Sequence, residues 1–102
     1  MSWNVLITAR VFTAVGKPAL DYLRRNGCNV IVPDPFGPFS AADLQPKLTD
    51  VDATLCSPDQ YTSEVLQSPE AARLKVISRW GVGYDSIDVA EATLQGIVVA
   101  YT

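Results

Sequence analysis

Five short apolar runs, separated by segments that carry helix-capping residues, limit the fold of this sequence more than any other feature. The runs cover residues 4–9, 28–33, 53–56, 75–79 and 97–101. Strands that alternate with helices are joined by right-handed crossovers, which build a parallel sheet with helices on both faces. The strand order 2-1-3-4-5 suits a chain with five such strands. We therefore predict an α/β protein with a flavodoxin-like, doubly wound, five-stranded parallel sheet.

The helices expected between these runs have recognisable first and last residues. The clearest helix spans residues 17–26, where Pro18 suits the first turn and Gly27 ends the helix. Each later helix follows an N-cap residue, namely Ser40, Thr62, Ser68 or Asp88. The first of these helices has an alternative start at Asp43, which would place Pro46 harmlessly in the first turn.

The charge balance argues against two classes of partner. The chain has 8 basic and 11 acidic residues, a net charge of −3. A nucleic-acid or anionic-membrane binder usually shows a basic excess. No apolar run is as long as a membrane span, and the N-terminus lacks a signal-peptide pattern. We therefore expect a cytoplasmic protein with no nucleic-acid and no membrane partner.

Cysteine and histidine usage limits the chemistry. The two cysteines, Cys28 and Cys56, are too few for a disulfide scaffold or a zinc site, so we expect reduced and mostly buried thiols. Histidine is absent, which removes the commonest general base and a leading metal ligand. We therefore predict no catalytic residue of this type and no metal site.

The loop Gly81-Val82-Gly83 follows the fourth predicted strand and precedes the helix that begins after Asp88. Glycine lets a ligand approach the backbone closely, and bare N–H groups at such a loop can bind an anion. The third glycine of the dinucleotide fingerprint is missing. Spacing alone therefore leaves two interpretations open, an anion site and a purely structural turn.

The predicted sheet places this loop at a functional edge. Ligands of doubly wound sheets bind at the carboxyl ends of the strands, beside the switch point between strands one and three. In this sequence that rim comprises residues 8–12, 56–59 and 79–83.

Residues 74–88, centred on Trp80-Gly81-Val82-Gly83-Tyr84-Asp85, closely resemble the signature of the D-isomer-specific 2-hydroxyacid dehydrogenases. This family includes phosphoglycerate dehydrogenase and the glyoxylate/hydroxypyruvate reductases. The likeness continues through residues 91–102 and extends back to residues 61–66. The family's enzymes have a flavodoxin-like substrate domain and an inserted nucleotide domain that binds NAD(P). The resemblance implies that residues 1–102 are a fragment of the substrate-binding (catalytic) domain, without the nucleotide-binding domain.

The resemblance also implies where a ligand binds. The backbone amides of Val82 and Gly83 would hold the carboxylate of a small 2-oxo or 2-hydroxy acid, with Gly81 in the same loop and Ser57 as a second contact. Two departures stand out. Cys56 occupies the place of an arginine in the phosphoglycerate-type enzymes, which puts a phosphorylated substrate in doubt because a thiol cannot replace a bidentate guanidinium. Ser86 replaces a common asparagine.

The implied parent enzyme interconverts 2-hydroxy and 2-oxo acids by hydride transfer with NAD or NADP. The family's catalytic arginine, glutamate and histidine, and its cofactor loop, lie in the nucleotide domain. This chain alone would therefore bind no cofactor and be inactive, with the missing domain as its natural partner. Without that domain and the returning C-terminal segment, apolar surface should be exposed, which favours self-association.

Three alternatives remain for comparison. The chain could be a stable folding unit, or an excised flavodoxin-like domain, with no ligand function of its own. A phosphorelay receiver needs clustered aspartates after the first strand and a lysine after the fifth, where this chain has Thr8-Ala9-Arg10 and Tyr101-Thr102. A flavin binder of the flavodoxin type needs a loop rich in glycine and hydroxyl residues after the first strand, and residues 8–13 contain no glycine.

Overall fold

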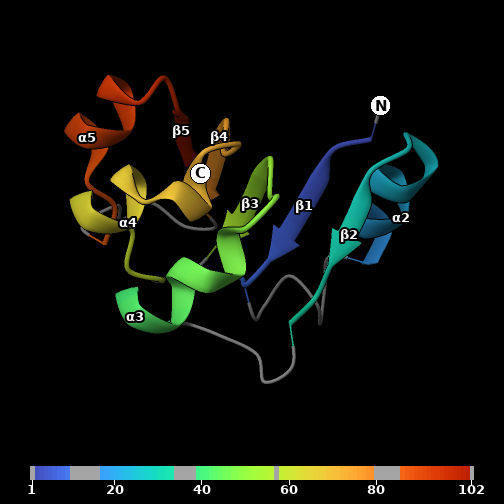
Figure 1. Ribbon diagram of the computed structural model, residues 1–102. Coiled ribbons are helices and arrows are strands. Elements are labelled where there is room, and N and C mark those ends of the chain that lie inside the picture. Colours follow the sequence, from blue (N-terminus) through green and yellow to red (C-terminus); the bar gives the residue numbers. More distant parts are fainter. Residues whose placement is uncertain (1, 10–16, 34–38, 57, 80–85, 102) are drawn as a thin grey trace.

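A parallel sheet forms the centre of the fold (Figure 1). The computed structural model describes residues 2–9, 17–33, 39–56, 58–79 and 86–101, and within them five strands lie in the order β2-β1-β3-β4-β5. The strands are β1 (Asn4–Ile7), β2 (Asn29–Ile31), β3 (Ala53–Cys56), β4 (Val76–Arg79) and β5 (Val98–Tyr101). The predicted order 2-1-3-4-5 is therefore confirmed.

Strands β4 and β5 each begin one residue later than the sequence predicts, and two other strands are shorter by more than one residue. Residues 4–9 were expected to be extended, whereas β1 ends at Ile7 because the N–H groups of Thr8 and Ala9 both donate to the carbonyl of Leu55, at 2.8 and 3.1 Å. Because both N–H groups use the same carbonyl, the regular hydrogen-bond ladder between β1 and β3 ends at this point. Residues 28–33 likewise shrink to Asn29–Ile31, since the N–H of Cys28 still donates to Leu23 in the preceding helix, at 3.0 Å.

Helices cover both faces of the sheet. Helix α2 (Lys17–Arg25) contributes Leu20 to a cluster with Val5 and Ile7. The other face is covered by α3 (Ala41–Leu44), α4 (Ser63–Gln67) and α5 (Val89–Leu94), with the short 3₁₀ helices η1 (Gln45–Leu48) and η2 (Pro69–Ala71). Figure 1 shows α2 beside β2, and α3, α4 and α5 grouped at the opposite side of the molecule. The predicted two-sided cover is present.

The larger apolar cluster lies under α3, α4 and α5 and forms the main core. Its fully buried members include Leu6 on β1, Ile77 on β4 and Leu44 on α3. Each such side chain contributes about 1.5–3 kcal/mol when it leaves water. The core therefore fixes β1, β3 and β4 relative to one another and holds their carboxyl ends in place.

Three of the predicted N-caps are confirmed. Ser40 Oγ accepts from the N–H of Asp43, Thr62 Oγ1 from that of Val65, and Asp88 Oδ1 from that of Glu91, at 3.4, 3.3 and 3.0 Å. Helix α3 therefore begins after Ser40 rather than after Asp43, and Pro46 instead lies at the start of η1. These hydrogen bonds satisfy N–H groups that have no partner within the helix.

The prediction that the Ser68 side chain caps a helix is wrong. Pro69 does begin η2, as predicted, but the hydroxyl of Ser68 donates back to the carbonyl of Val65, at 2.6 Å, and does not cap η2. Gly27 and Gly96, with φ of 84° and 76°, end α2 and α5 as expected, because other residues rarely adopt this conformation.

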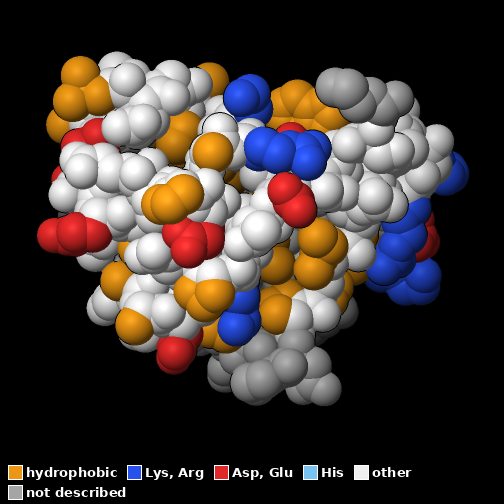
Figure 2. Space-filling view, in the orientation of Figure 1, with side chains coloured by type: hydrophobic (Ala, Val, Ile, Leu, Met, Phe, Trp, Pro, Cys, Tyr) orange, Lys and Arg blue, Asp and Glu red, His pale blue; other side chains and the backbone are white. Residues whose placement is uncertain are grey.

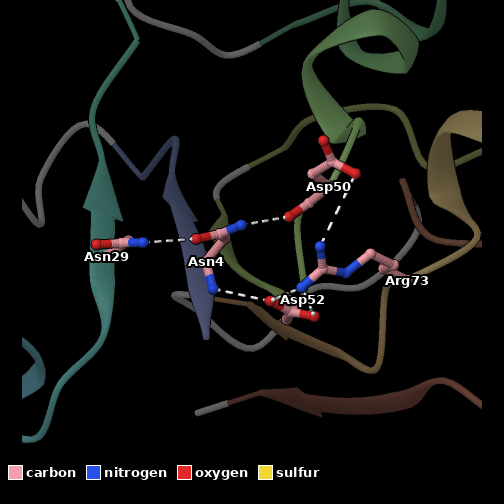
Figure 3. A network of polar contacts seen from close by, with 5 residues as sticks. All are labelled: Asn4, Asn29, Asp50, Asp52 and Arg73. Carbon is pink, nitrogen blue, oxygen red and sulfur yellow. Dashed lines mark hydrogen bonds and ion pairs between the residues drawn. The ribbon is translucent and has the colours of Figure 1, made fainter. Parts of the chain in front are cut away.

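A polar network joins the amino ends of the strands (Figure 3). The carboxylate of Asp52 accepts from the backbone N–H of Asn4, at 2.8 Å, and from Arg73 Nη2, at 3.2 Å. Asn4 Nδ2 donates to the carbonyl of Asp50, and Asn29 Nδ2 donates to Asn4 Oδ1, at 2.7 and 2.9 Å. The network links β1 and β2 to the turn that enters β3, at the edge opposite the predicted rim.

The surface shows charges of both signs and some exposed apolar side chains. In Figure 2 basic side chains gather over α2, where Asp21 forms ion pairs with Lys17 and Arg24. On β5, Val98 is 61% exposed, on the sheet face that α2 covers elsewhere. The expected self-association through such surface remains a prediction. Among the described residues no helix is long and apolar enough to cross a membrane.

Candidate functional site

The carboxyl ends of β1, β3 and β4 lie side by side at the edge opposite the polar network. Thr8 follows β1, and Cys56 at the end of β3 is the register partner of Arg79 at the end of β4. From β1 the chain adds β2 on one side of the sheet, and β3, β4 and β5 on the other side. The switch point therefore lies between β1 and β3, which is where doubly wound sheets bind ligands. Of the predicted rim, the structure describes residues 8, 9, 56, 58, 59 and 79, and these lie at the carboxyl ends of β1, β3 and β4.

The residues predicted to contact a ligand, Ser57, Gly81, Val82 and Gly83, all lie outside the described residues. The structure does describe the residues that flank them. Residue 57 comes between Cys56 and Pro58, and residues 80–85 come between Arg79 and Ser86. The geometry of the site is therefore given by the described residues around these positions.

The buried carboxylate of Asp59 joins the end of β1 to the residue that precedes the N-cap of α3. Asp59 is fully buried; its Oδ2 accepts from the hydroxyl of Thr8 at 2.7 Å, and its Oδ1 accepts from the N–H of Phe39 at 2.6 Å. The next residue adds two contacts to the same segment, because the N–H of Gln60 donates to the carbonyl of Phe39 and Gln60 Oε1 accepts from the N–H of Ala41. A buried polar group costs free energy unless it is hydrogen-bonded, and each oxygen of this carboxylate has a donor.

The backbone of Tyr61 binds the residues that follow position 85. Its N–H donates to the carbonyl of Ser86 and its own carbonyl accepts from the N–H of Asp88, both at 2.9 Å, which forms a parallel bridge with Ile87. The tyrosine is fully buried, so this connection is fixed in the core. Residues 59–61 thus hold the end of β1, the start of α3 and the residues that follow the loop 80–85.

The thiol of Cys56 is not a nucleophile. Burial raises its pKa to about 12, and the nearby charge of Asp59 adds to the rise, although Arg79 opposes it. A thiol with this pKa stays neutral at physiological pH, and buried neutral thiols are unreactive. Both Cys56 and Cys28 are free, as predicted, with Cys56 buried and Cys28 half-buried.

Within the described ranges, no group of three or more histidine, cysteine, aspartate or glutamate residues could hold a metal ion. The six glycines nowhere form the Gly-x-Gly-x-x-Gly pattern of a dinucleotide loop. Among the described residues we therefore assign neither a metal site nor a dinucleotide loop.

Sequence reasoning did not identify Asp59 as a functional residue. Residue 59 was included in the predicted rim but had no predicted role. The local sequence holds no signal for its burial, which depends on Thr8 and Phe39, 51 and 20 residues away.

A five-stranded parallel sheet in the order 2-1-3-4-5, with helices on both faces, defines a flavodoxin-like α/β domain. Residues 5–102 match the sequence profile described as D-isomer specific 2-hydroxyacid dehydrogenase, catalytic domain. This chain belongs to that family.

Named relatives agree with this assignment. A glyoxylate reductase of Thermofilum pendens is 39% identical over 90 residues, which is 86% of this chain and 26% of the relative. A D-3-phosphoglycerate dehydrogenase of Archaeoglobus fulgidus is 36% identical over 85 residues, which is 83% of this chain and 15% of the relative. The chain thus spans about a quarter or less of these two proteins.

The fold is also similar to solved structures. The PH0520 protein from Pyrococcus horikoshii matches the whole of this chain with a TM-score of 0.81 and 32% sequence identity. This chain corresponds to 28% of that structure. The NAD⁺-bound 3-phosphoglycerate dehydrogenase of Entamoeba histolytica has the same TM-score at 22% identity, which shows the shared fold.

Proposed function

We propose that this chain is the substrate-binding half of an NAD(P)-dependent D-2-hydroxyacid dehydrogenase. In this proposal the backbone amides of Val82 and Gly83 hold the carboxylate of a small 2-oxo or 2-hydroxy acid, next to Gly81, and Ser57 makes a second contact. The parent enzyme interconverts the two acids by hydride transfer. The nucleotide-binding domain, with NAD or NADP, is the partner that supplies the catalytic groups.

The pairing of Cys56 with Arg79 is the observation that carries this proposal. Because these register partners end neighbouring strands, the described residues that precede Ser57 and residues 80–85 lie next to each other. Cys56 also ends β3, which borders the switch point between β1 and β3. Two segments that the family resemblance assigns to the substrate thus start from adjacent positions.

The state of Cys56 supports a substrate without a phosphate group. Its thiol is buried and uncharged, so it offers none of the paired N–H donors with which arginine binds phosphate. Several relatives of this chain are glyoxylate reductases, one at 39% identity. Glyoxylate, a small 2-oxo acid, is therefore the probe of choice.

Titration of the ¹⁵N-labelled chain with glyoxylate is expected to shift the amide resonances of Val82 and Gly83 in a saturable manner. Glycolaldehyde, which lacks the carboxylate, should leave them in place. The variant V82P removes one of the two N–H donors and should weaken the response at Gly83, whereas V82A keeps both donors and should retain it. Unchanged amide resonances at saturating glyoxylate would favour the alternative, a stable folding unit with no ligand function.

The purified chain is expected to show no NADH oxidation with glyoxylate or hydroxypyruvate. It has no histidine to supply the proton that accompanies hydride transfer, and no dinucleotide loop to bind the cofactor. Absorbance of NADH over time measures this directly, with the glyoxylate reductase of Thermofilum pendens as positive control. Turnover above the background without protein would contradict the expectation.

A further inference from the structure

We propose that Asp59 is a positioning residue for the substrate-binding rim, and that it acts through the segment 59–61. The inference rests on the proposed function, because it concerns the same site. Asp59 touches no substrate in this proposal. Its side chain fixes the end of β1 and the residue before the N-cap of α3, while the backbone two residues later fixes the residues that follow position 85.

The first step of the argument is the geometry of the carboxylate. Each oxygen of Asp59 has its own donor: the hydroxyl of Thr8 at 2.7 Å and the N–H of Phe39 at 2.6 Å. Thr8 directly follows β1, and Phe39 directly precedes the N-cap of α3. One buried side chain therefore sets the separation of two segments at the switch point.

The second step is the connection to the glycine loop. Two residues after Asp59, the backbone of Tyr61 bonds to Ser86 and Asp88, at 2.9 Å each. The segment is short and both Asp59 and Tyr61 are fully buried, so neither end can move into solvent. A shift of Asp59 is thereby passed on to the residues that follow the loop 80–85.

The third step is the choice of side chain. Alanine at position 59 would leave the N–H of Phe39 and the hydroxyl of Thr8 without their partner, both in a buried setting. Asparagine can keep both contacts, since its carbonyl oxygen accepts from Phe39 while its amide donates to the Thr8 oxygen. D59A therefore removes both hydrogen bonds, whereas D59N removes only the carboxylate and can keep both hydrogen bonds.

The experiment compares D59A, D59N and D52A by the same glyoxylate titration of labelled protein, under conditions in which every variant is folded. Asp52 is the matched control, because it also accepts from one backbone N–H and one side chain but lies at the opposite edge of the sheet. We expect D59A to raise the Kd for glyoxylate at least about tenfold, which corresponds to about 1.4 kcal/mol. D59N should largely restore the affinity, and D52A should leave it unchanged.

Equal weakening by D59A and D52A would overturn the proposal, because the effect would then reflect general destabilisation. An unchanged Kd in D59A would overturn it as well. If D59A does not fold, T8V takes its place, since it removes one of the two contacts and should also raise the Kd.

A second readout separates this inference from the proposed function. Without ligand, D59A should shift the amide resonances of residues 80–85 by clearly more than D52A does. If the wild-type chain does not bind glyoxylate but this difference is present, the positioning role holds and the proposed substrate fails. If the two variants shift these resonances equally, the positioning role is wrong.

Discussion

Raising the pH from 8 to 11 is expected to lower the free energy of unfolding of this chain by at least about 2 kcal/mol. Burial raises the pKa of the Cys56 thiol from its ordinary value of 9.0 to about 12, and burial raises that of the Tyr61 hydroxyl well above 10.0. Below pH 9 both groups are protonated in the folded and the unfolded chain, so they contribute no pH dependence. Above pH 9 the unfolded chain releases protons that the folded chain retains, and stability falls as the pH rises.

The magnitude follows from the number of protons released. Each group contributes a slope of about 1.4 kcal/mol per pH unit between its unfolded and folded pKa. At pH 11 the thiol has therefore cost about 2–3 kcal/mol, and the phenol adds to this loss in the same direction. The loss is a large part of the roughly 5–15 kcal/mol that stabilise a typical small domain.

Urea denaturation at several pH values measures the effect. The double variant C56A/Y61F removes both groups and should lose most of the alkaline slope. The single variants should each lose their own share, with the loss in Y61F beginning about one pH unit higher. A double variant that keeps the full slope would show that other groups cause the alkaline loss of stability.

Much of the fold was predictable because its determinants are local. Residues 53–56 form β3 with the predicted bounds, since the polar turn at Asp50–Asp52 precedes an apolar run that ends before Ser57-Pro58. The capping residues Thr62 and Asp88 bond to N–H groups three residues away, a distance at which sequence pattern and structure coincide. The strand order followed from the alternation of these elements and their number.

What could not be predicted depends on residues far apart in the chain. The end of β1 is set by the carbonyl of Leu55, and the burial of Asp59 is set by Thr8 and Phe39. A turn sequence cannot reveal such partners. The ligand contacts at residues 57 and 81–83 stand on the family resemblance, because spacing alone did not distinguish an anion site from a structural turn.

Replacing Asp52 with alanine is expected to cost about 2–3 kcal/mol of stability, mainly through the loss of its hydrogen bond to the backbone N–H of Asn4. This bond, at 2.8 Å, involves a side chain that is only 13% exposed (Figure 3). The ion pair with Arg73 adds less, because the arginine is 47% exposed and solvent screens the attraction.

The variant R73A tests how much of the stability comes from each contact, since it removes the ion pair with Asp52 and keeps the hydrogen bond from Asn4. We expect R73A to cost less than about 1 kcal/mol, and the double variant D52A/R73A to cost little more than D52A. Urea denaturation at neutral pH measures all three free energies. If R73A alone cost as much as D52A, the ion pair and not the backbone bond would hold this edge. The difference matters because the backbone bond fixes β1 to the turn before β3, the same pair of strands whose opposite ends form the proposed binding edge.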